Sequence, residues 1–417
     1  MDIYKFGGAS VKDASSVQNV LKVLKLSGAK DKVIVISAMG KMTNAFEVVI
    51  KDYLSNSKVI PESLSEIRSY HLEIINGLFH SKQASIYKKL ETLFEEIQNF
   101  MVHNKSNKYD FVYDQLVCFG ELISSTIVSE YFTQEGINHT WVDARTLIKT
   151  DNIYRDASVN WEETQNRISK NIKKEHLYLT QGFIAGDTNN FTTTLGREGS
   201  DYTAAIFAYC LNAEKVVIWK DVAGILNADP RVFENPQLLH QISYEEAIEL
   251  AFYGASVIHP KTLQPLQRKE IPLFVKSFID PSGSGTAVSK GQTLVPAIPC
   301  FIVKKDQVLI SLSSLDFSFM VEENISEVFR LFHLYQIKVD LIQNSAISFA
   351  VCVDNKFNNL EKLIQHLKAR YKVSYTTGVS LYTIRHFDEG AIKSLEKDKE
   401  VLLKQVMQNT VQIVTKA

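Results

Sequence analysis

The sequence predicts an α/β protein with a mostly parallel central sheet sandwiched by helices, followed by a smaller region of the ferredoxin-like, split βαβ type. Two observations lead to this prediction. Short apolar runs alternate with helix-patterned segments through the first part of the chain, and repeated βα units imply a parallel sheet with helices on both faces. Beyond about residue 299 the elements become shorter and follow a βαββα order.

The first expected elements alternate regularly. A short apolar strand at 3–6 precedes a helix from about 13 to 26. The next strand, 33–36, is β-branched throughout, which is typical of a central buried strand. A long, polar, helix-patterned stretch from about 44 to 104 has no strand signal, and we interpret it as a helical insertion.

The alternation then resumes. Buried strands are expected at 177–183, 216–219 and 273–275, with helices at 201–211 and 243–252 between them. In open sheets of this kind, ligands bind at the carboxyl ends of the strands. The polar motifs considered below fall mainly at such ends.

The composition also divides the chain into parts. Residues 280–286 are rich in Pro, Ser and Gly and form the clearest linker. We therefore expect one domain over residues 1–295 and a second region over residues 296–417. The second region is long enough for one full split βαβ module and a shortened second one.

The charge balance excludes some classes of partner. The 417 residues include 46 basic and 47 acidic side chains and are 45% hydrophobic, which is typical of a packed globular protein. Without a broad basic surface, a nucleic acid is not an expected partner. A small anionic substrate would have to be held by local charges.

No membrane span, signal peptide or disulfide framework is expected. We find no apolar run near the roughly 18–20 residues of a membrane span, and the first residues lack the pattern of a signal peptide. The cysteines stand far apart, as in a reducing compartment; they are Cys118, Cys210, Cys300 and Cys352. The expected location is the cytoplasm.

The first chemical motif is a strand that ends in Lys5, followed at the turn by Gly7 and Gly8. Glycines let the backbone approach a ligand and present bare N–H groups to it, and the next helix adds its positive N-terminal end. The segment is typical of a phosphate-binding turn with its own cation. A tight turn beside a surface lysine remains the alternative.

Two further motifs also precede expected helices. Thr43, in segment 37–44, could be a helix cap or a substrate contact. In segment 194–201, glycines flank Arg197, a side chain that binds carboxylates bidentately. Asp201 could cap the following helix or face Mg²⁺ and phosphate.

Two later segments are less informative by themselves. Residues 219–231 follow a buried strand and mix acidic residues, Gly, Pro and Arg, which an ordinary loop would also do. Residues 254–261 end one helix and start another, so that Lys261 lies near a helix start. His259 is more typical of a structural histidine than of a catalyst.

Taken in order, these segments resemble the monofunctional aspartate kinases of the amino acid kinase superfamily. The resemblance covers nearly the whole chain and rests on 5–11, 119–121, 182–183, 196–201, 219–231 and 254–261. The region from about 300 resembles the ACT regulatory modules of that family, with segment 338–345 similar to their effector-binding segment.

The resemblance implies a role for each matching position. The residues implied in phosphoryl transfer are Lys5, Gly7, Gly8 and Asp201. Those implied around aspartate are Thr43, Glu121, Phe183, Arg197 and Ser200, with Arg197 suited to the α-carboxylate and Glu121 to the α-ammonium. Those implied in ATP binding are Lys5, Gly7, Gly8, Trp219, Lys220, Asp221, Arg231 and Lys261. The implied effector contacts are Asp340 and Ser345.

The implied reaction converts ATP and L-aspartate into ADP and 4-phospho-L-aspartate, the first step in the biosynthesis of lysine, threonine and methionine. Mg²⁺ would be bound mainly through the nucleotide phosphates, and no side-chain metal site is expected. The family further implies a lysine or threonine effector and a homodimer or dimer of dimers.

Three positions depart from the family pattern. Ala9 and Lys220 each stand where threonine is usual, and Glu198 replaces a common glycine beside Arg197. The extra carboxylate of Glu198 would either weaken aspartate binding or pair with a neighbouring cation. The alternative functions are another superfamily kinase that acts on a different carboxylate, and a non-catalytic amino-acid sensor. A fused homoserine dehydrogenase is not expected, because the 417 residues leave no room for one and contain no dinucleotide fingerprint.

Overall fold

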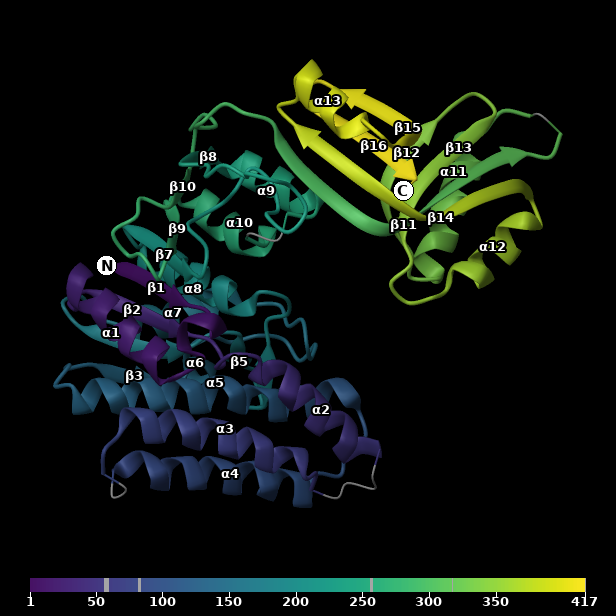
Figure 1. Ribbon diagram of the computed structural model, residues 1–417. Coiled ribbons are helices and arrows are strands. Elements are labelled where there is room, and N and C mark those ends of the chain that lie inside the picture. The colour runs from purple at the N-terminus through teal and green to yellow at the C-terminus, as the bar shows by residue number, and fades with distance from the viewer. Residues whose placement is uncertain (56–59, 82–83, 256–257, 317, 417) are drawn as a thin grey trace. The chain divides into compact units, whose positions relative to one another are not determined.

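The computed structural model describes residues 1–55, 60–81, 84–255, 258–316 and 318–416. The chain forms two compact units, each described by itself below (Figure 1). Unit 1 comprises Met1–Ile225, Leu238–Ile248 and Val257–Val295, and unit 2 comprises Leu226–Gln237, Glu249–Ser256 and Pro296–Ala417. Two short segments before residue 296 thus belong to unit 2, which the sequence pattern did not indicate.

Unit 1 is built on an eight-stranded sheet of order β3-β4-β2-β1-β7-β9-β10-β8. Neighbouring strands are parallel except for the antiparallel pair of β9 and β10. The strands are β1 (Asp2–Phe6), β2 (Lys32–Ile36), β3 (Thr140–Val142), β4 (Leu177–Gln181), β7 (Lys215–Lys220), β8 (Gln241–Ser243), β9 (Leu273–Ser277) and β10 (Thr286–Ser289). The predicted fold class of this part is confirmed.

Helices lie on both faces of this sheet because successive side chains of a strand point to opposite faces. Tyr4 and Phe6 of β1 pack in a hydrophobic core with α1 to α5, whereas Lys5 between them reaches Asp201 of α8. These helices are α1 (Ala14–Ser27), α2 (Met42–Ser55), α3 (Ser63–Leu78), α4 (Ser85–His103), α5 (Tyr109–Gln134) and α8 (Gly199–Leu211). The stretch interpreted as a helical insertion contains most of α2 and all of α3 and α4.

Helix α5 is the one helix among the described residues that is long and apolar enough to cross a membrane by length and composition alone. It is 26 residues long and its most apolar window is apolar enough for a membrane span, but 83% of that window is buried inside the structure. Buried polar residues such as Asp114 and Glu121 interrupt the helix, so it contains no long uninterrupted apolar run. This burial is typical of a core helix, and α5 contributes many residues to the core of unit 1.

The remaining elements of unit 1 are short helices and a hairpin. They are the 3₁₀-helix η1 (Gly8–Val11), α6 (Ala144–Leu147), α7 (Trp161–Asn171), the hairpin of β5 (Ile184–Gly186) and β6 (Thr192–Thr194), α9 (Tyr244–Tyr253, which continues into unit 2) and α10 (Pro260–Arg268). Local sequence explains the start of α10. The His259 ring accepts a hydrogen bond from the Lys261 N–H, and Pro260 occupies the first helical turn.

Unit 2 contains a six-stranded antiparallel sheet of order β12-β13-β11-β14-β16-β15 with three helices. Its elements are β11 (Cys300–Ser314), α11 (Glu322–Leu334), β12 (Lys338–Asn344), β13 (Ser348–Asp354), α12 (Leu360–Lys368), β14 (Tyr371–Arg385), α13 (Glu389–Glu396), β15 (Glu400–Met407) and β16 (Thr410–Lys416). The long central strands β11 and β14 pair along their length. The two expected modules therefore share one continuous sheet.

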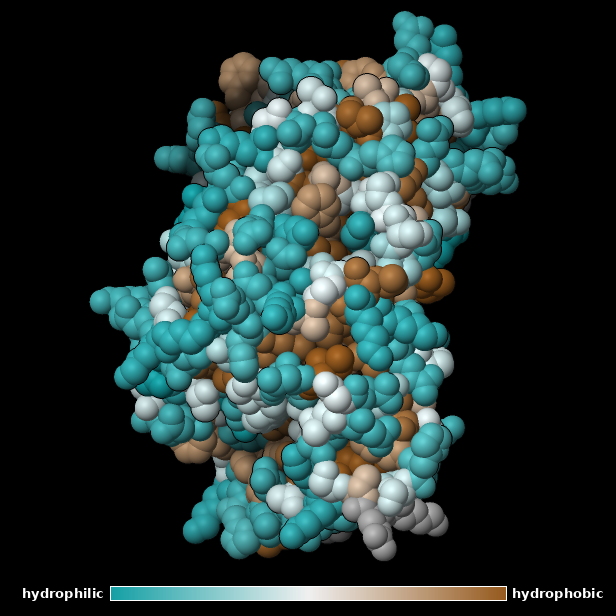
Figure 2. Space-filling model, turned by 90° about the vertical axis from the view of Figure 1, so that its left-hand side faces the viewer, coloured by the Kyte–Doolittle hydropathy of each residue, from teal (hydrophilic) through white to brown (hydrophobic). Residues whose placement is uncertain are grey.

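The surface view shows hydrophilic side chains over most of one face, with hydrophobic side chains in small groups between them (Figure 2). The four cysteines are buried and free of disulfides. Their burial agrees with the prediction of ordinary core thiols.

Candidate functional site

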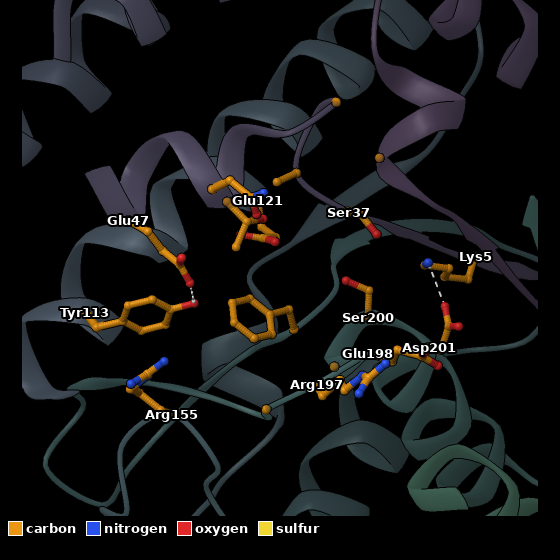
Figure 3. A pocket seen from close by; sticks show the side chains of 18 of the residues that line it. Lys5, Ser37, Glu47, Tyr113, Glu121, Arg155, Arg197, Glu198, Ser200 and Asp201 are labelled. Carbon is orange, nitrogen blue, oxygen red and sulfur yellow. Dashed lines mark hydrogen bonds and ion pairs between the residues drawn. The ribbon is translucent and has the colours of Figure 1, made fainter. Parts of the chain in front are cut away.

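A cavity of about 600 Å³ in unit 1 brings together most of the predicted site residues (Figure 3). It lies among the end of β1, the turn after β2, the start of α2, the middle of α5 and the turn that begins α8. The predicted residues that line it are Lys5, Gly8, Thr43, Glu121, Phe183, Arg197, Ser200, Asp201 and Lys220. A cluster of this kind at the carboxyl ends of parallel strands is the expected place for a ligand.

A buried charge cluster occupies one end of the cavity. The Lys5 Nζ lies 2.6 Å from Asp201 Oδ1, and the Lys220 Nζ lies 3.6 Å from Asp201 Oδ2. Burial would raise the pKa of Asp201, but the two ammonium groups outweigh it and hold that pKa below its usual value. The carboxylate therefore stays ionised, and the cluster retains a positive charge that can face an anion.

Close backbone packing fixes the turn after β1. The Gly40 N–H donates to the Gly8 carbonyl over 3.0 Å, and a Cβ at Gly8 would lie 2.7 Å from the Gly40 oxygen and 2.8 Å from the Ala38 oxygen. Real side chains do not tolerate such contacts with backbone atoms. Only glycine at position 8 therefore lets the two turns meet beside Lys5.

We expect Gly8→Ala to lower the free energy of unfolding by about 1–3 kcal/mol, as overpacking does, and to reduce the activity proposed below. The methyl group must push the two turns apart next to Lys5. Urea unfolding and steady-state kinetics would measure both effects. Gly283→Ala is the matched control, because its Cβ would meet no atom closer than 3.4 Å. Equal behaviour of the two variants would contradict this account.

Glu121 is a deeply buried acid of the cavity. Helix α5 carries it into the interior, where 2% of the residue is exposed. Burial raises the pKa of its carboxyl to about 8, and nearby backbone N–H groups, including that of Ala38, offset this only partly. Its Oε2 has no hydrogen-bond partner among the residues that the structure describes. An acceptor in this position is suited to a cationic ligand group.

Arg197 supplies an unpaired cation in the same cavity. Within the described part of the chain its guanidinium makes no ion pair, and the residue is exposed to the cavity. Ser200 lies at the start of α8 and packs closely against Gly182. A Cβ added at Gly182 would come within 2.4 Å of the Ser200 Cβ. Phe183, the residue after Gly182, has a positive φ of 69°. These contacts hold the turn at one wall of the cavity.

The sequence did not indicate three polar residues that line the cavity with these groups, Glu47, Tyr113 and Arg155. The Tyr113 hydroxyl donates to Glu47 Oε1 over 3.3 Å, and the Arg155 guanidinium lies 4.7 Å from the Tyr113 ring centre. Figure 3 shows them on the side away from Lys5 and Asp201. Buried Asp114 supports this side by accepting bonds from the Arg155 and Thr194 backbones. The sequence did contain one indication of this side of the cavity, because Asp114 and Glu121 are polar residues two helical turns apart in an otherwise apolar helix.

Several predicted nucleotide contacts do not line the cavity. Gly7 adjoins it in the β1 turn, and the Trp219 ring is buried in the core, stacked on Phe6 at 6.0 Å. Asp221 is exposed after β7. Lys261, at the start of α10, forms an ion pair with Asp156.

The remaining predicted residues belong to unit 2. Arg231 is exposed and paired with Asp229 at 2.7 Å. Asp340 is the predicted effector contact, but its carboxylate already pairs with Lys304 at 2.8 Å and with Lys338 at 3.3 Å. Ser345 is exposed in the turn after β12.

Comparison with known proteins gives a consistent result. Residues 3–277 match the model of the amino acid kinase family. The chain is 31% identical over 394 residues to the lysine-sensitive aspartokinase 3 of Escherichia coli, covering 92% of this chain and 86% of that protein. It is 30% identical over 357 residues to the aspartokinase of Chlamydia pneumoniae, covering 84% and 77% of the two chains.

Solved structures agree over the full length. The E. coli aspartokinase III structure in complex with aspartate and ADP, described as the R-state, has a TM-score of 0.80 at 28% identity and covers 100% of this chain and 96% of that one. The T-state structure of the same enzyme with lysine and aspartate has a TM-score of 0.79 at 28% identity, covering 99% and 95%. The aspartate kinase of Clostridium acetobutylicum has a TM-score of 0.81 at 20% identity, covering 100% and 96%, and supports the fold.

Proposed function

Since the chain belongs to the amino acid kinase family and, within it, to the aspartokinases, we propose that it transfers the γ-phosphoryl group of ATP to the side-chain carboxylate of L-aspartate. One observation carries the proposal. One cavity holds the Lys5–Asp201–Lys220 cluster together with two groups that form no ion pair with any described residue, the buried carboxylate of Glu121 and the guanidinium of Arg197. The first set suits phosphate, and the last two suit an amino acid zwitterion.

Lys5 is the proposed phosphoryl-stabilising cation. Asp201 holds its ammonium at the mouth of the glycine turn, where Gly7 and Gly8 would offer backbone N–H groups to the phosphates. Lys220 adds a second positive charge beside the same carboxylate. Charge that develops on the phosphoryl oxygens in the transition state would meet groups already in position.

Glu121 and Arg197 are the proposed ends of the aspartate site. Ionised Glu121 would pair with the α-ammonium, and Arg197 would bind the α-carboxylate bidentately. Thr43, Ser200 and Phe183 would complete the walls. The β-carboxylate is already ionised at neutral pH, so it can attack phosphorus without a general base, and the enzyme supplies mainly orientation and charge neutralisation.

The residues present fit a Mg²⁺ ion that arrives with the nucleotide. In the described ranges no group of three or more His, Cys, Asp or Glu side chains could hold a metal by itself, and the Asp201 oxygens face lysines. Phosphate oxygens would then be the main ligands. When bound, the ion supplies further neutralisation of phosphate charge. Nucleotide binding is assigned to Asp221, the backbone at Trp219 and Lys261. Lys261 would leave its ion pair with Asp156 and bind a phosphate instead.

Unit 2 is the proposed regulatory unit. Lysine and threonine remain the candidate effectors, and the relative named lysine-sensitive supports the former. An effector cation at Asp340 would have to displace Lys304, which already holds that carboxylate. The nearly balanced charge gives no support for a nucleic-acid partner. A cytoplasmic location is proposed from the buried free cysteines, and a homodimer or dimer of dimers from the family resemblance.

Formation of acyl hydroxamate tests the reaction. The purified chain, ATP, Mg²⁺ and hydroxylamine are combined with L-aspartate, L-glutamate or N-acetylglutamate, and the trapped acyl phosphate is measured by its coloured iron complex. We expect signal with L-aspartate alone. Addition of lysine or threonine to the same reactions tests whether unit 2 is regulatory. Signal with another acid would assign the chain to a different member of the family. Folded protein without signal would favour an amino-acid sensor and overturn the proposal.

A further inference from the structure

Glu198 occupies a position that its backbone does not favour. It lies between Arg197 and Gly199 at the start of α8, with φ of 54° and ψ of 30°. This is the left-handed region, which a residue with a Cβ adopts only at a cost in free energy that glycine avoids. Such a conformation persists where the surrounding structure compensates for it, for example by a side-chain interaction that a glycine could not make.

The carboxylate of Glu198 makes such an interaction. Its Oε2 accepts a hydrogen bond of 2.9 Å from the backbone N–H of His259. His259 is the residue that caps α10, and the carboxylate thus lies at the positive N-terminal end of that helix. A neighbouring cation was one possible partner for this extra carboxylate, but the partner is instead a backbone donor 61 residues away.

This contact joins one wall of the candidate site to the start of α10, which lies outside the cavity lining. On one side, Glu198 adjoins Arg197 in the turn that lines the cavity. On the other, His259 leads directly into α10, where Lys261 pairs with Asp156. The Arg197 turn is therefore held against the start of α10 by the Glu198 side chain.

The contact also decides where the negative charge of Glu198 lies. Figure 3 shows Arg197 and Glu198 next to each other at one wall of the cavity, yet the structure has no ion pair between them. A carboxylate released from His259 could turn to the adjacent guanidinium and compete with a substrate carboxylate for it. Bound to His259, it leaves Arg197 free.

We propose that Glu198 is a positioning residue for substrate binding, which fastens the Arg197 turn to the start of α10 and keeps its own charge off Arg197. The kinetic test of this proposal rests on the proposed function, because it measures aspartate phosphorylation. The contact between Glu198 and His259 can also be tested in a protein without that activity.

The kinetic test compares three substitutions at one position. Glu198→Gln keeps a side-chain oxygen that can accept from the His259 N–H, so the KM for L-aspartate should stay within about twofold of wild type. Glu198→Ala and Glu198→Gly lose the acceptor and should raise that KM about three- to tenfold, the scale of one ordinary hydrogen bond, with kcat nearly unchanged. Glu198→Gly should also have a melting temperature equal to or above wild type, because the left-handed strain is relieved.

The matched control is Glu175→Gly, which removes the same residue type from the same left-handed conformation (φ 63°) outside the cavity. It should leave KM unchanged. A residue with only a structural role would instead show a melting temperature and activity that fall together. Unchanged KM in the Ala and Gly variants, or a Gln variant that behaves like Ala, would overturn the proposal.

Hydrogen exchange supplies a readout that does not depend on catalysis. In the full-length protein, the amide of His259 should exchange at least about fivefold faster in Glu198→Ala than in wild type, and at nearly the wild-type rate in Glu198→Gln. If wild type is inactive in the hydroxamate assay but this pattern appears, the proposed function fails and the contact stands. Equal exchange in all variants would refute the fastening role even in an active enzyme.

Discussion

Replacement of Lys5 by alanine is expected to lower kcat for aspartate phosphorylation by about 10²–10³, which corresponds to about 3–4 kcal/mol of lost transition-state stabilisation. Lys5 is buried at the end of β1, and its ammonium is held by Asp201 at 2.6 Å. The Lys5 ammonium therefore needs no reorganisation when charge develops on the phosphoryl oxygens. The KM for L-aspartate should change much less, because the proposed aspartate contacts are left in place.

Two further variants separate the charge of Lys5 from its packing. Lys5→Met keeps most of the side-chain volume and should lose as much activity as Lys5→Ala. Lys32→Ala is the matched control, since Lys32 is also buried, lies on the neighbouring strand β2, and donates to the Ser27 and Lys30 carbonyls without lining the cavity. It should keep kcat within about threefold. A kcat for Lys5→Ala within tenfold of wild type would reject the assigned role.

Replacement of Glu121 by glutamine is expected to lower kcat/KM for L-aspartate by about 10²-fold, near the lower end of the loss seen when one partner of a buried charge pair is removed. The amide has the shape of the acid but not its charge, so the substrate ammonium would lose its proposed counter-ion. Steady-state kinetics with varied L-aspartate measures the effect. Glu47→Gln, a half-buried acid of the same cavity, serves as control and should change kcat/KM much less.

The pKa of Glu121 adds a pH dependence with a definite sign. Burial raises that pKa to about 8 in the free protein, and only the ionised form pairs with an ammonium. The KM for L-aspartate should therefore fall as pH rises from about 6 to 8, by at most tenfold per pH unit, and then level off. Glu121→Gln should lose this dependence. A flat wild-type profile over this range would contradict the assignment.

The same shift predicts how stability depends on pH. Between the ordinary carboxyl pKa and about 8, the folded protein holds a proton on Glu121 that the unfolded chain has lost. This contribution to the free energy of unfolding is fully present below the ordinary pKa and is lost as pH rises toward 8. Glutamine avoids the loss, so the melting temperature of Glu121→Gln relative to wild type should be higher at pH 8 than at pH 6.

Much of the fold could be predicted from local patterns. The β-branched run of β2 predicted a central buried strand, and it lies between β1 and β4 in the middle of the parallel sheet. The turn after β1 could be recognised because glycines next to a strand-borne lysine have a direct geometric use. Helix α5 was harder, since its Asp114 and Glu121 interrupt the apolar pattern that would have revealed a long core helix.

The candidate site, too, could be predicted from the sequence only in part. The sequence by itself determined which residue types stand in the turns before the expected helices, and the family resemblance built on those turns grouped Lys5, Arg197 and Asp201. Only the tertiary structure decided that Glu121 is desolvated, that Glu198 accepts from His259, and that Asp340 is already paired with Lys304. The physical reason is that periodicity and turn chemistry act between neighbours in the chain, whereas desolvation and charge pairing depend on which distant segments pack together.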